Sequence, residues 1–306
     1  MNFGTLLCAF FIALLGIALG TSNATLSTLL ISNAIAQLVL FVVVACIPYL
    51  RTGRMSYVDI AWPFGVALIG VHVLLLGDGD LVRRGIVGGI YLMIGLRMGI
   101  GALTMAKTSG VIFKTEFPRY QYRHMMLEKT GTKHPKFHAL AEIMAQGFAN
   151  MSALALPGFL LAINPNSTIA SWEIAGIALW VVAYIFESTA DAQKLRFIAN
   201  PDNKGGVCNI GLWRYSRHPN YFAEWLVWTG LVIATVPSWL ALANSETTLV
   251  WLSLGIGAVA ASGMLYTTLV YLTGAVPAEY YSAQKRPAYK QYQQTTNRFF
   301  PWFPKS

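Results

Sequence analysis

Residues 247–273 read TTLVWLSLGIGAVAASGMLYTTLVYLT, an apolar run of 27 residues without Asp, Glu, Lys or Arg. A helix of about 20 residues crosses the hydrocarbon core of a bilayer, so this run is long enough to span a membrane. Its apolar residues do not alternate with a period of two, as the strands of a membrane barrel do. Because only helices and closed barrels satisfy every backbone hydrogen-bonding group in lipid, the run predicts a transmembrane helix.

Further runs of the same kind precede it, and they set the fold class. They lie at about residues 3–20, 26–49, 57–77, 85–106, 139–163, 168–193 and 221–241. The first run has no basic segment before it and no clear cleavage site, so we expect a retained helix and not a signal peptide. The chain is therefore predicted to be an all-α, multi-pass integral membrane helix bundle with seven to eight transmembrane helices. With no internal repeat and no separate soluble segment, residues 1–306 are expected to form a single membrane domain.

The formal net charge of +9 could indicate a nucleic-acid partner, but the distribution of the charge argues against one. Of the 22 Lys and Arg residues, 19 fall in the predicted loops 51–56, 107–137, 194–220 and 275–306. Loops 21–25, 164–169 and 241–246 have none, and in loop 78–84 Arg83 and Arg84 are set against Asp78 and Asp80. This alternation follows the positive-inside rule and predicts both termini on the cytoplasmic side.

No metal site is predicted. Cys8, Cys46 and Cys208 are far apart in the sequence, and the chain has no CxxC motif and no Cys/His cluster. His134 and His138 flank a proline in a basic loop, which favours a solvated surface role.

Ionisable residues inside the apolar runs are the informative exceptions, because each is costly in lipid unless it faces a partner or a wet cavity. They suggest a polar cavity that opens to the cytoplasm. The alternative is interhelical ion pairing, for example between Arg97 and Asp59, and for Glu142 a helix-dipole role is favoured. The residues concerned are Asp59, Arg97, Glu142, Glu187, Asp191 and Glu224.

The stretch GLWRYSRHPNYFAEW, residues 211–225, places polar residues directly before an apolar run. Pro219 is suited to a first helical turn, so Asn220, Glu224 and Trp228 share one helix face at i, i+4 and i+8. An Asn and an acid at this spacing could hold a carboxamide such as that of nicotinamide, with Trp228 as a flat wall for a ring.

Cations gather at the predicted start of this helix, where exposed backbone N–H groups favour an anion. We expect Arg214, Arg217 and His218 to bind phosphate groups, and Tyr215, between them, is also predicted to bind the cofactor. Asp191, beside Lys194 and Arg196, could accept ribose hydroxyls while arginines hold a 2′-phosphate, which favours NADP over NAD. The alternative is that these are positive-inside loop charges with an interfacial Trp. The chain has no GxGxxG after a strand, so no Rossmann site is predicted.

The motif GLWRYSRHPNYFAEWLVWTG, with ESTADAQKLRF upstream, resembles the C-terminal domain of the steroid 5-alpha-reductase family, in particular its bacterial branch, and related sterol reductases. The clear match covers about residues 180–300, and SYVDIAWP and EFPRYQYR extend it weakly. The resemblance implies an oxidoreductase of a bacterial inner membrane that binds NADPH from the cytoplasm. Its implied reaction is reduction of the carbon–carbon double bond of a 3-oxo-Δ4 steroid.

The resemblance also implies residue roles. Residues 1–137 would form the substrate side and residues 180–306 the cofactor-binding region, with Asn220 and Glu224 holding the nicotinamide. The remaining implied roles are Trp228 beside the cofactor, Asp191 and Arg196 at the adenosine ribose and phosphate, Tyr281 near the cofactor with Tyr280 as a rival, and Asp59 with Tyr91 polarising the substrate carbonyl. The family has Glu where this chain has Asp59, which shortens the reach by one methylene.

Two other functions stay open from the sequence. The same region resembles isoprenylcysteine and phospholipid methyltransferases, which use S-adenosylmethionine, although those enzymes have a small residue soon after the Tyr. A non-enzymatic lipid-binding membrane protein is the third possibility. In the favoured case the partners are a lipophilic substrate from the bilayer and membrane lipid, and the chain is expected to be a monomer.

Overall fold

The computed structural model describes residues 3–305, and it is all-helical, with 77% of the chain in helices. In this range an isolated bridge joins Val111 and Thr115, and no β-strand is formed. Among the described residues, seven helices are long and apolar enough to cross a membrane. These observations confirm the predicted all-α, multi-pass membrane fold.

The candidate spans lie close to the predicted runs, and most extend a few residues beyond them. They are Ala24–Thr52, Met55–Leu76, Leu81–Ser109, Pro135–Ala162, Ser171–Ala199, Pro219–Ala241 and Thr248–Lys285. The first apolar run forms α1, Phe3–Ala18, which at 16 residues is shorter than these seven.

The chain divides into two compact units. Unit 1 consists of residues 1–174 and 232–261, and unit 2 consists of residues 175–231 and 262–306. Three helices therefore contribute to both units: α9 (Ser171–Ala199), α10 (Pro219–Ala241) and α11 (Thr248–Thr267).

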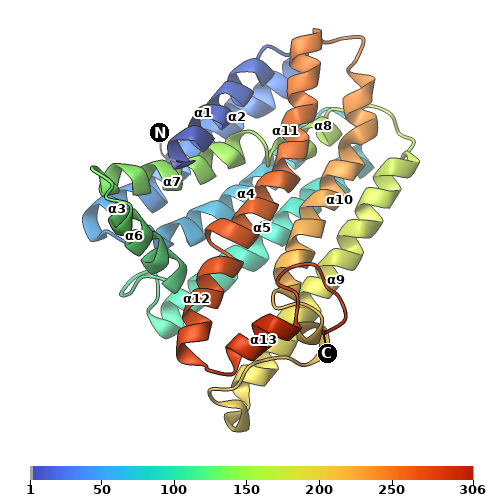
Figure 1. Ribbon diagram of the computed structural model, residues 1–306. Coiled ribbons are helices and arrows are strands. Elements are labelled where there is room, and N and C mark those ends of the chain that lie inside the picture. Colours follow the sequence, from blue (N-terminus) through green and yellow to red (C-terminus); the bar gives the residue numbers. More distant parts are fainter. Residues whose placement is uncertain (1–2, 306) are drawn as a thin grey trace. The chain divides into compact units, whose positions relative to one another are not determined.

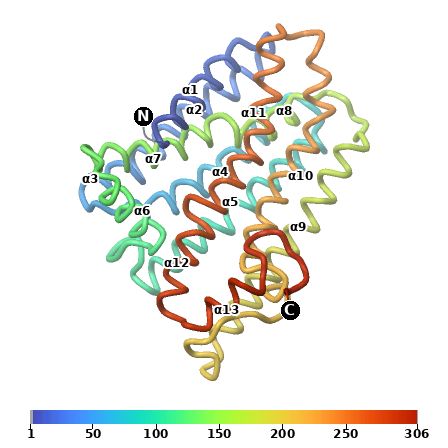
Figure 2. The backbone as a smooth tube through the Cα atoms, in the orientation of Figure 1, coloured from blue at the N-terminus to red at the C-terminus, as the bar shows by residue number. Residues whose placement is uncertain are grey.

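Within unit 1, α4 (Val58–Leu76) and α5 (Leu81–Ser109) lie side by side, as Figures 1 and 2 show. Small residues permit the close approach. A Cβ atom on Gly95 would lie 2.3 Å from the backbone nitrogen of Ala67, so a larger residue there would push the helices apart. The other helices of this unit before α9 are α2 (Ala24–Phe41), α3 (Ile47–Thr52), α6 (Pro118–Lys129), α7 (Pro135–Met151) and α8 (Leu156–Ala162), with a π-turn at Val42–Cys46 and a 3-10 turn at Met55–Tyr57.

The predicted fifth span is not one continuous helix. It is broken between α7 and α8, and the cause is Pro157 in the first turn of α8. A proline has no N–H and its ring clashes with the carbonyl four residues earlier, here that of Ala153. The break is buried, and the Tyr91 hydroxyl donates a hydrogen bond to the carbonyl of Leu154 at 2.6 Å. A helix at membrane depth can be interrupted here because a side chain satisfies the freed backbone group.

Three fully buried amides link α2, α4 and α7 in unit 1. Gln37 Nε2 donates to Asn33 Oδ1 at 3.1 Å and to the Gly65 carbonyl at 2.8 Å. Asn150 Nδ2 donates to the Trp62 carbonyl at 3.1 Å. Polar side chains at this depth are expensive to leave unpaired, so the network fixes how these helices pack.

Arg83 corrects one expectation from the sequence. The sequence suggested that Asp78 and Asp80 balance its charge within loop 78–84. Its guanidinium is instead paired with Glu173, with Nε 2.8 Å from Oε2, and both side chains are only 2% exposed. The guanidinium also donates to the carbonyls of Asn164, Asn166 and Thr168, which closes loop 163–170 onto α5. Asp80 instead caps the start of α5 by accepting from the backbone N–H of Arg83.

Unit 2 contains the second part of α9, the first part of α10 and the end of α11, followed by a π-turn at Thr268–Leu272. The remaining elements are α12 (Ala275–Lys285), α13 (Tyr289–Thr295) and the 3-10 turns η3 (Pro201–Asn203) and η4 (Gly211–Arg214). After α13 the C-terminal residues fold back to the start of α10, where Phe299 is buried among Phe222, Trp225 and Tyr266 at ring-centroid distances of 5.2–6.0 Å.

Candidate functional site

The loop between α9 and α10 in unit 2 is held against α9. Gly211 has a φ of +55°, a left-handed conformation that favours glycine, and a Cβ there would lie 2.6 Å from the Gln193 side chain. Gln193 Oε1 accepts from the N–H of Leu212 at 2.9 Å, and the Trp213 indole donates to the Ala190 carbonyl at 2.9 Å. The loop therefore has a defined path that delivers residues 214–218 to the first turn of α10.

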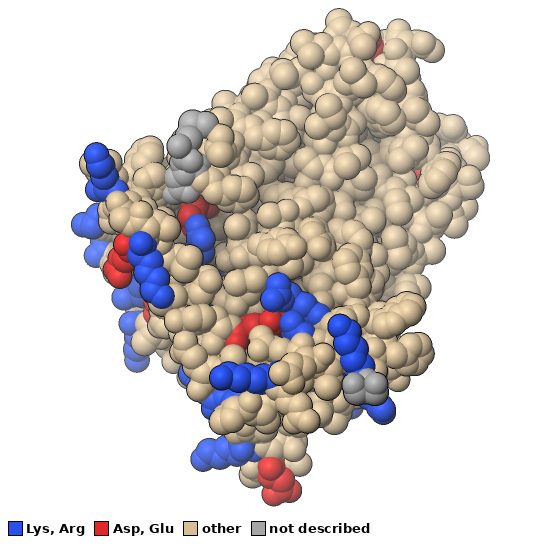
Figure 3. Space-filling model, viewed as in Figure 1, with Lys and Arg blue, Asp and Glu red and all other residues tan. Residues whose placement is uncertain are grey.

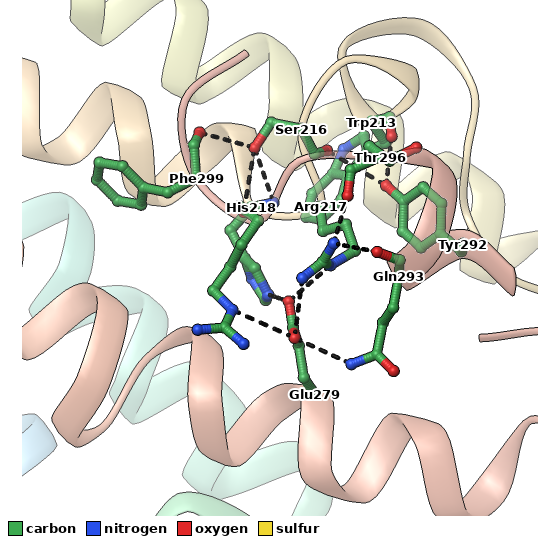
Figure 4. Close-up of polar contacts among 10 residues, drawn as sticks. Trp213, Ser216, Arg217, His218, Glu279, Tyr292, Gln293, Thr296 and Phe299 are labelled. Carbon is green, nitrogen blue, oxygen red and sulfur yellow. Dashed lines mark hydrogen bonds and ion pairs between the residues drawn. The ribbon is translucent and has the colours of Figure 1, made fainter. Parts of the chain in front are cut away.

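Glu279, on α12, is the centre of the polar contacts drawn in Figure 4. Its carboxylate binds Arg217 in a two-point contact, with Nε to Oε1 at 2.8 Å and Nη2 to Oε2 at 3.1 Å. Gln293 donates to Oε2 at 3.0 Å, and Arg298 approaches the same oxygen at 3.4 Å. Both members of the central pair are buried, so each is the main neutralising partner of the other.

His218 contacts the same carboxylate, with Nε2 3.2 Å from Glu279 Oε1. Its ring stacks on Tyr221 at a centroid distance of 5.2 Å. Burial lowers the pKa of His218, and the opposing effect of the Glu279 carboxylate does not restore it to the ordinary value. The imidazole is therefore neutral at pH 7, and its hydrogen bond to Glu279 joins the loop before α10 to α12.

The C-terminal residues close over the same loop. Arg217 Nη1 donates to the Gln293 carbonyl at 3.0 Å and to that of Thr296, and its backbone N–H donates to the Asn297 carbonyl at 2.9 Å. The Tyr292 hydroxyl donates to the carbonyls of Trp213 and Ser216, and burial raises the pKa of this phenol, which keeps it protonated. Arg217 thus fixes the tail to the loop as well as pairing with Glu279.

The structure brings Asn220 together with Asp191. Asn220 Nδ2 donates to Asp191 Oδ1 at 3.1 Å, from the first turn of α10 to α9. The other amide atom, Asn220 Oδ1, is buried and has no hydrogen-bond partner among residues 3–305. Glu224 and Trp228 follow one and two turns further along α10, and Trp228 is fully buried. Asn220, Glu224 and Trp228 therefore follow one another along α10, and the first of them has a buried amide oxygen without a hydrogen-bond partner among the described residues.

The other two arginines of the predicted site, Arg196 and Arg214, are exposed, unlike Arg217. Arg298, which was not predicted, has a side chain that is 42% exposed. Lys194 lies over the Trp213 ring, with Nζ 4.4 Å from its centroid. In the view of Figure 3, Lys and Arg side chains gather around α12 and α13 of unit 2, and separately at the α3 and α6 end of unit 1.

Two predicted tyrosines of unit 2 have other surroundings. Tyr215 is exposed and packs edge-on against Phe303 at 5.9 Å, next to the C-terminal aromatics. Tyr281 lies on α12 and packs edge-on against its rival Tyr280 at 5.1 Å. Neither contact selects one of these tyrosines for a cofactor.

In unit 1, Asp59 lies in the first turn of α4, and its partners are two residues of α6. Its Oδ2 accepts from Arg119 Nη2 at 2.6 Å and its Oδ1 accepts from the Tyr120 hydroxyl at 2.9 Å. Both carboxylate oxygens of Asp59 therefore accept hydrogen bonds within unit 1. Burial, followed by the charge of Asp59, raises the pKa of Tyr120 well above its ordinary value, so this phenol remains protonated.

The structure does not bring Tyr91 next to Asp59. Tyr91 is fully buried on α5. It faces Gly70 of α4, where an added Cβ atom would lie 3.0 Å from the Tyr91 Cβ. Gly70 is 11 residues beyond Asp59 on α4, or about 16 Å along the helix. The Tyr91 hydroxyl is engaged with the Leu154 carbonyl and accepts from the N–H of Gly158 at 3.2 Å.

The sequence did not indicate the partners of Arg217 in unit 2 or of Asp59 in unit 1. Glu279, Tyr292 and Gln293 lie in the basic and aromatic tail segment PAEYYSAQKRPAYKQYQ, and Arg119 and Tyr120 lie in KTEFPRYQYRHM. The interleaving of charged and aromatic residues was the available signal. It does not tell which acid will pair with which arginine, because those contacts join residues about 60 positions apart.

Comparison with known proteins identifies the family of this chain. Residues 47–296 match the family described as "Protein of unknown function (DUF1295)". The chain belongs to this family. An uncharacterised protein of Schizosaccharomyces pombe, C594.04c, is 23% identical over 278 aligned residues, which cover 82% of this chain and 73% of the relative. No solved structure matches the chain. The family description assigns no activity, so a functional proposal rests on the site itself.

Proposed function

We propose that this protein is a membrane-embedded, NADPH-dependent reductase of the carbon–carbon double bond of a 3-oxo-Δ4 steroid or a similar enone lipid. The observation that carries the proposal is Asn220 Oδ1, a buried acceptor without a partner at the start of the polar stripe on α10. A buried polar atom left unpaired costs about 1–3 kcal/mol, so such an atom points to a ligand that donates a hydrogen bond.

A nicotinamide carboxamide fits this position. Its NH₂ group would donate to Asn220 Oδ1, while Asp191 holds the other end of the Asn220 amide and fixes which atom faces the ligand. Glu224, one turn along the same helix, offers carboxylate oxygens to the same group, and Trp228 offers an aromatic surface. A sulfonium ligand such as S-adenosylmethionine has no carboxamide to use this acceptor.

For the phosphate groups we propose partly different residues than the sequence suggested. Arg217 and His218 were expected at the phosphates, but they are engaged with Glu279, and we assign them to positioning the loop. The exposed cations Arg196, Arg214 and Arg298 are then the proposed phosphate partners. Because 19 of the 22 basic residues lie in loops predicted to be cytoplasmic, we propose that the cofactor enters from that side.

Bound NADPH would supply the hydride, and the reduced lipid would gain that hydride at the β-carbon and a proton from water at the α-carbon. The negative charge that develops on the carbonyl oxygen must be opposed by a polarising group. Within unit 1, Asp59 is hydrogen-bonded to Arg119 and Tyr120, and we assign this group and Tyr91, whose hydroxyl is engaged at the helix break, to the structure of that unit.

The proposal is tested by binding and turnover in purified protein. NADPH should raise the melting temperature more than NADH does, and a 3-oxo-Δ4 steroid should cause NADPH oxidation. Asn220→Leu should weaken NADPH binding by roughly 5- to 150-fold, the cost of an unpaired amide group. Asn203→Ala is the matched control, since the Asn203 amide donates to the Phe197 carbonyl in the turn after α9 and has no place in the proposed site. Stabilisation by S-adenosylmethionine and not by NADPH would contradict the assignment.

A further inference from the structure

The last residues of the chain form an exposed aromatic surface on unit 2. We call Tyr215, Phe300, Trp302 and Phe303 the C-terminal aromatic patch. The exposed fractions of these side chains are 37%, 51%, 68% and 72%. Phe299, directly before them, is only 4% exposed and anchors the segment in the aromatic core of the unit. A group of large aromatic side chains left in the open indicates an interaction surface.

The backbone of the patch is held in place. The Ser216 hydroxyl donates to the Phe299 carbonyl at 2.9 Å, and the Trp302 N–H donates to the Tyr215 carbonyl at 2.9 Å. The N–H of Lys305 donates to the Thr295 carbonyl at 2.8 Å. The segment is therefore a strap with fixed ends, and its aromatic side chains are displayed rather than loosely attached.

The patch lies at the level where a membrane span begins. Phe300 packs against Phe222 and Trp225, both at 5.8 Å, and these two rings belong to the first two turns of α10. Since α10 is a candidate span that starts at Pro219, we infer that this level lies at the boundary between water and hydrocarbon. Trp, Tyr and Phe at such a boundary are typical of side chains that insert between lipid headgroups.

The charges beside the patch select among possible occupants. Arg214, Arg298 and Lys305 are exposed, and all three are cations. A second copy of the chain would present the same cations and repel them, whereas acidic headgroups would attract them. We propose that the C-terminal aromatic patch is a membrane-interface anchor that binds acidic phospholipid headgroups. Arg214 and Arg298 are also the cations that we propose for the cofactor phosphates, whereas Lys305 belongs to the patch alone, so the test of this inference uses Lys305.

The anchor shares its attachment points with the candidate site. Arg217 holds the Asn297 carbonyl through its N–H and Glu279 through its guanidinium, so the strap and the loop before α10 are one hydrogen-bonded assembly.

The test is fluorescence quenching in nanodiscs that hold one chain each, with lipids brominated either near the headgroup or deep in the acyl chain. Wild type and Trp302→Phe are compared in phosphatidylcholine with and without phosphatidylglycerol. Trp302→Phe should lose a component of emission that is quenched by the shallow bromines more than by the deep ones. Lys305→Gln should reduce the gain in that quenching that phosphatidylglycerol gives, while its melting temperature stays that of wild type.

Two results would overturn the proposal. In the first, the Trp302 component is quenched by aqueous iodide and not by either brominated lipid, which would place the patch in water. In the second, the component is shielded only in discs that contain two chains, which would make a second copy the occupant.

Discussion

Neighbouring arginines of the loop before α10 have different surroundings. Arg214 and Arg217 are three positions apart and were both predicted to hold phosphate, yet one is exposed and the other is buried against Glu279. The difference is a matter of which arginine has a carboxylate within reach. A sequence does not reveal this, because Glu279 is 62 residues away.

Substitution of these two arginines should separate the roles. Arg217→Met removes the two-point contact from the buried Glu279 carboxylate, so we expect a loss of about 3–5 kcal/mol in the free energy of unfolding. Arg214→Met should leave the melting temperature unchanged and weaken NADPH binding. Denaturation in detergent and NADPH titration of both variants provide the measurement, and equal losses of stability would refute the distinction.

Arg83 offers a second residue-level prediction, in unit 1. Arg83→Met should destabilise the protein by about 3–5 kcal/mol, because Glu173 and three backbone carbonyls lose their donor. Replacing both partners, as Arg83→Met with Glu173→Met, should recover part of that loss since no buried charge remains. Unfolding experiments on the single and double variants measure the recovery. A double variant less stable than the single one would contradict the account.

At the scale of elements, the segment between α3 and α4 is joined to the segment before α6 by Glu116. Its carboxylate accepts from the backbone N–H of Met55 at 2.7 Å and of Ser56 at 3.0 Å, and also from the Ser56 hydroxyl. Burial alone would raise the pKa of Glu116, but these hydrogen bonds and the one from His124 outweigh burial, and its pKa is lowered from 4.5.

This shift predicts a pH dependence with a definite sign. The folded pKa lies below the unfolded one, so the stabilisation from Glu116 is fully present above about pH 4.5 and is lost as pH falls through the folded pKa. Glu116→Gln should therefore melt at a lower temperature than wild type at pH 7, and the difference in melting temperature should narrow as the pH falls below 4.5. Melting curves of the two proteins across this range measure it. A gap that stays constant with pH would rule out the role of the carboxylate.

The elements also show what the sequence can and cannot predict. The long apolar helices were predictable because apolar length is read directly from the chain, as in residues 247–273. The break at residues 152–155 was missed, although Pro157 was visible, because a proline near the end of an apolar run permits either a kink or a helix start. The turn of Asn220 toward Asp191 depends on how two helices face each other, and the spacing along one helix does not contain that information.

At the scale of the whole molecule, the chain is a multi-pass membrane protein whose basic loops alternate with loops that lack basic residues. The positive-inside rule assigns the basic loops to the cytoplasm. Single cysteines introduced at Lys133 and Lys204 should therefore react with an impermeant thiol reagent only from the cytoplasmic side, and one introduced at Ser245 only from the opposite side. Labelling of intact cells and inverted vesicles provides the measurement, and reaction of all three from one side would contradict the topology.

The central claim, that unit 2 binds NADPH through Asn220, is tested most directly by a melting scan of the purified protein with NADPH, NADH, S-adenosylmethionine and an acidic phospholipid, repeated on Asn220→Leu. We predict that NADPH stabilises wild type, by about 2.7 kcal/mol at a concentration 100 times its dissociation constant, and that Asn220→Leu loses most of this effect. Stabilisation of wild type by S-adenosylmethionine or lipid without any effect of NADPH would contradict the claim.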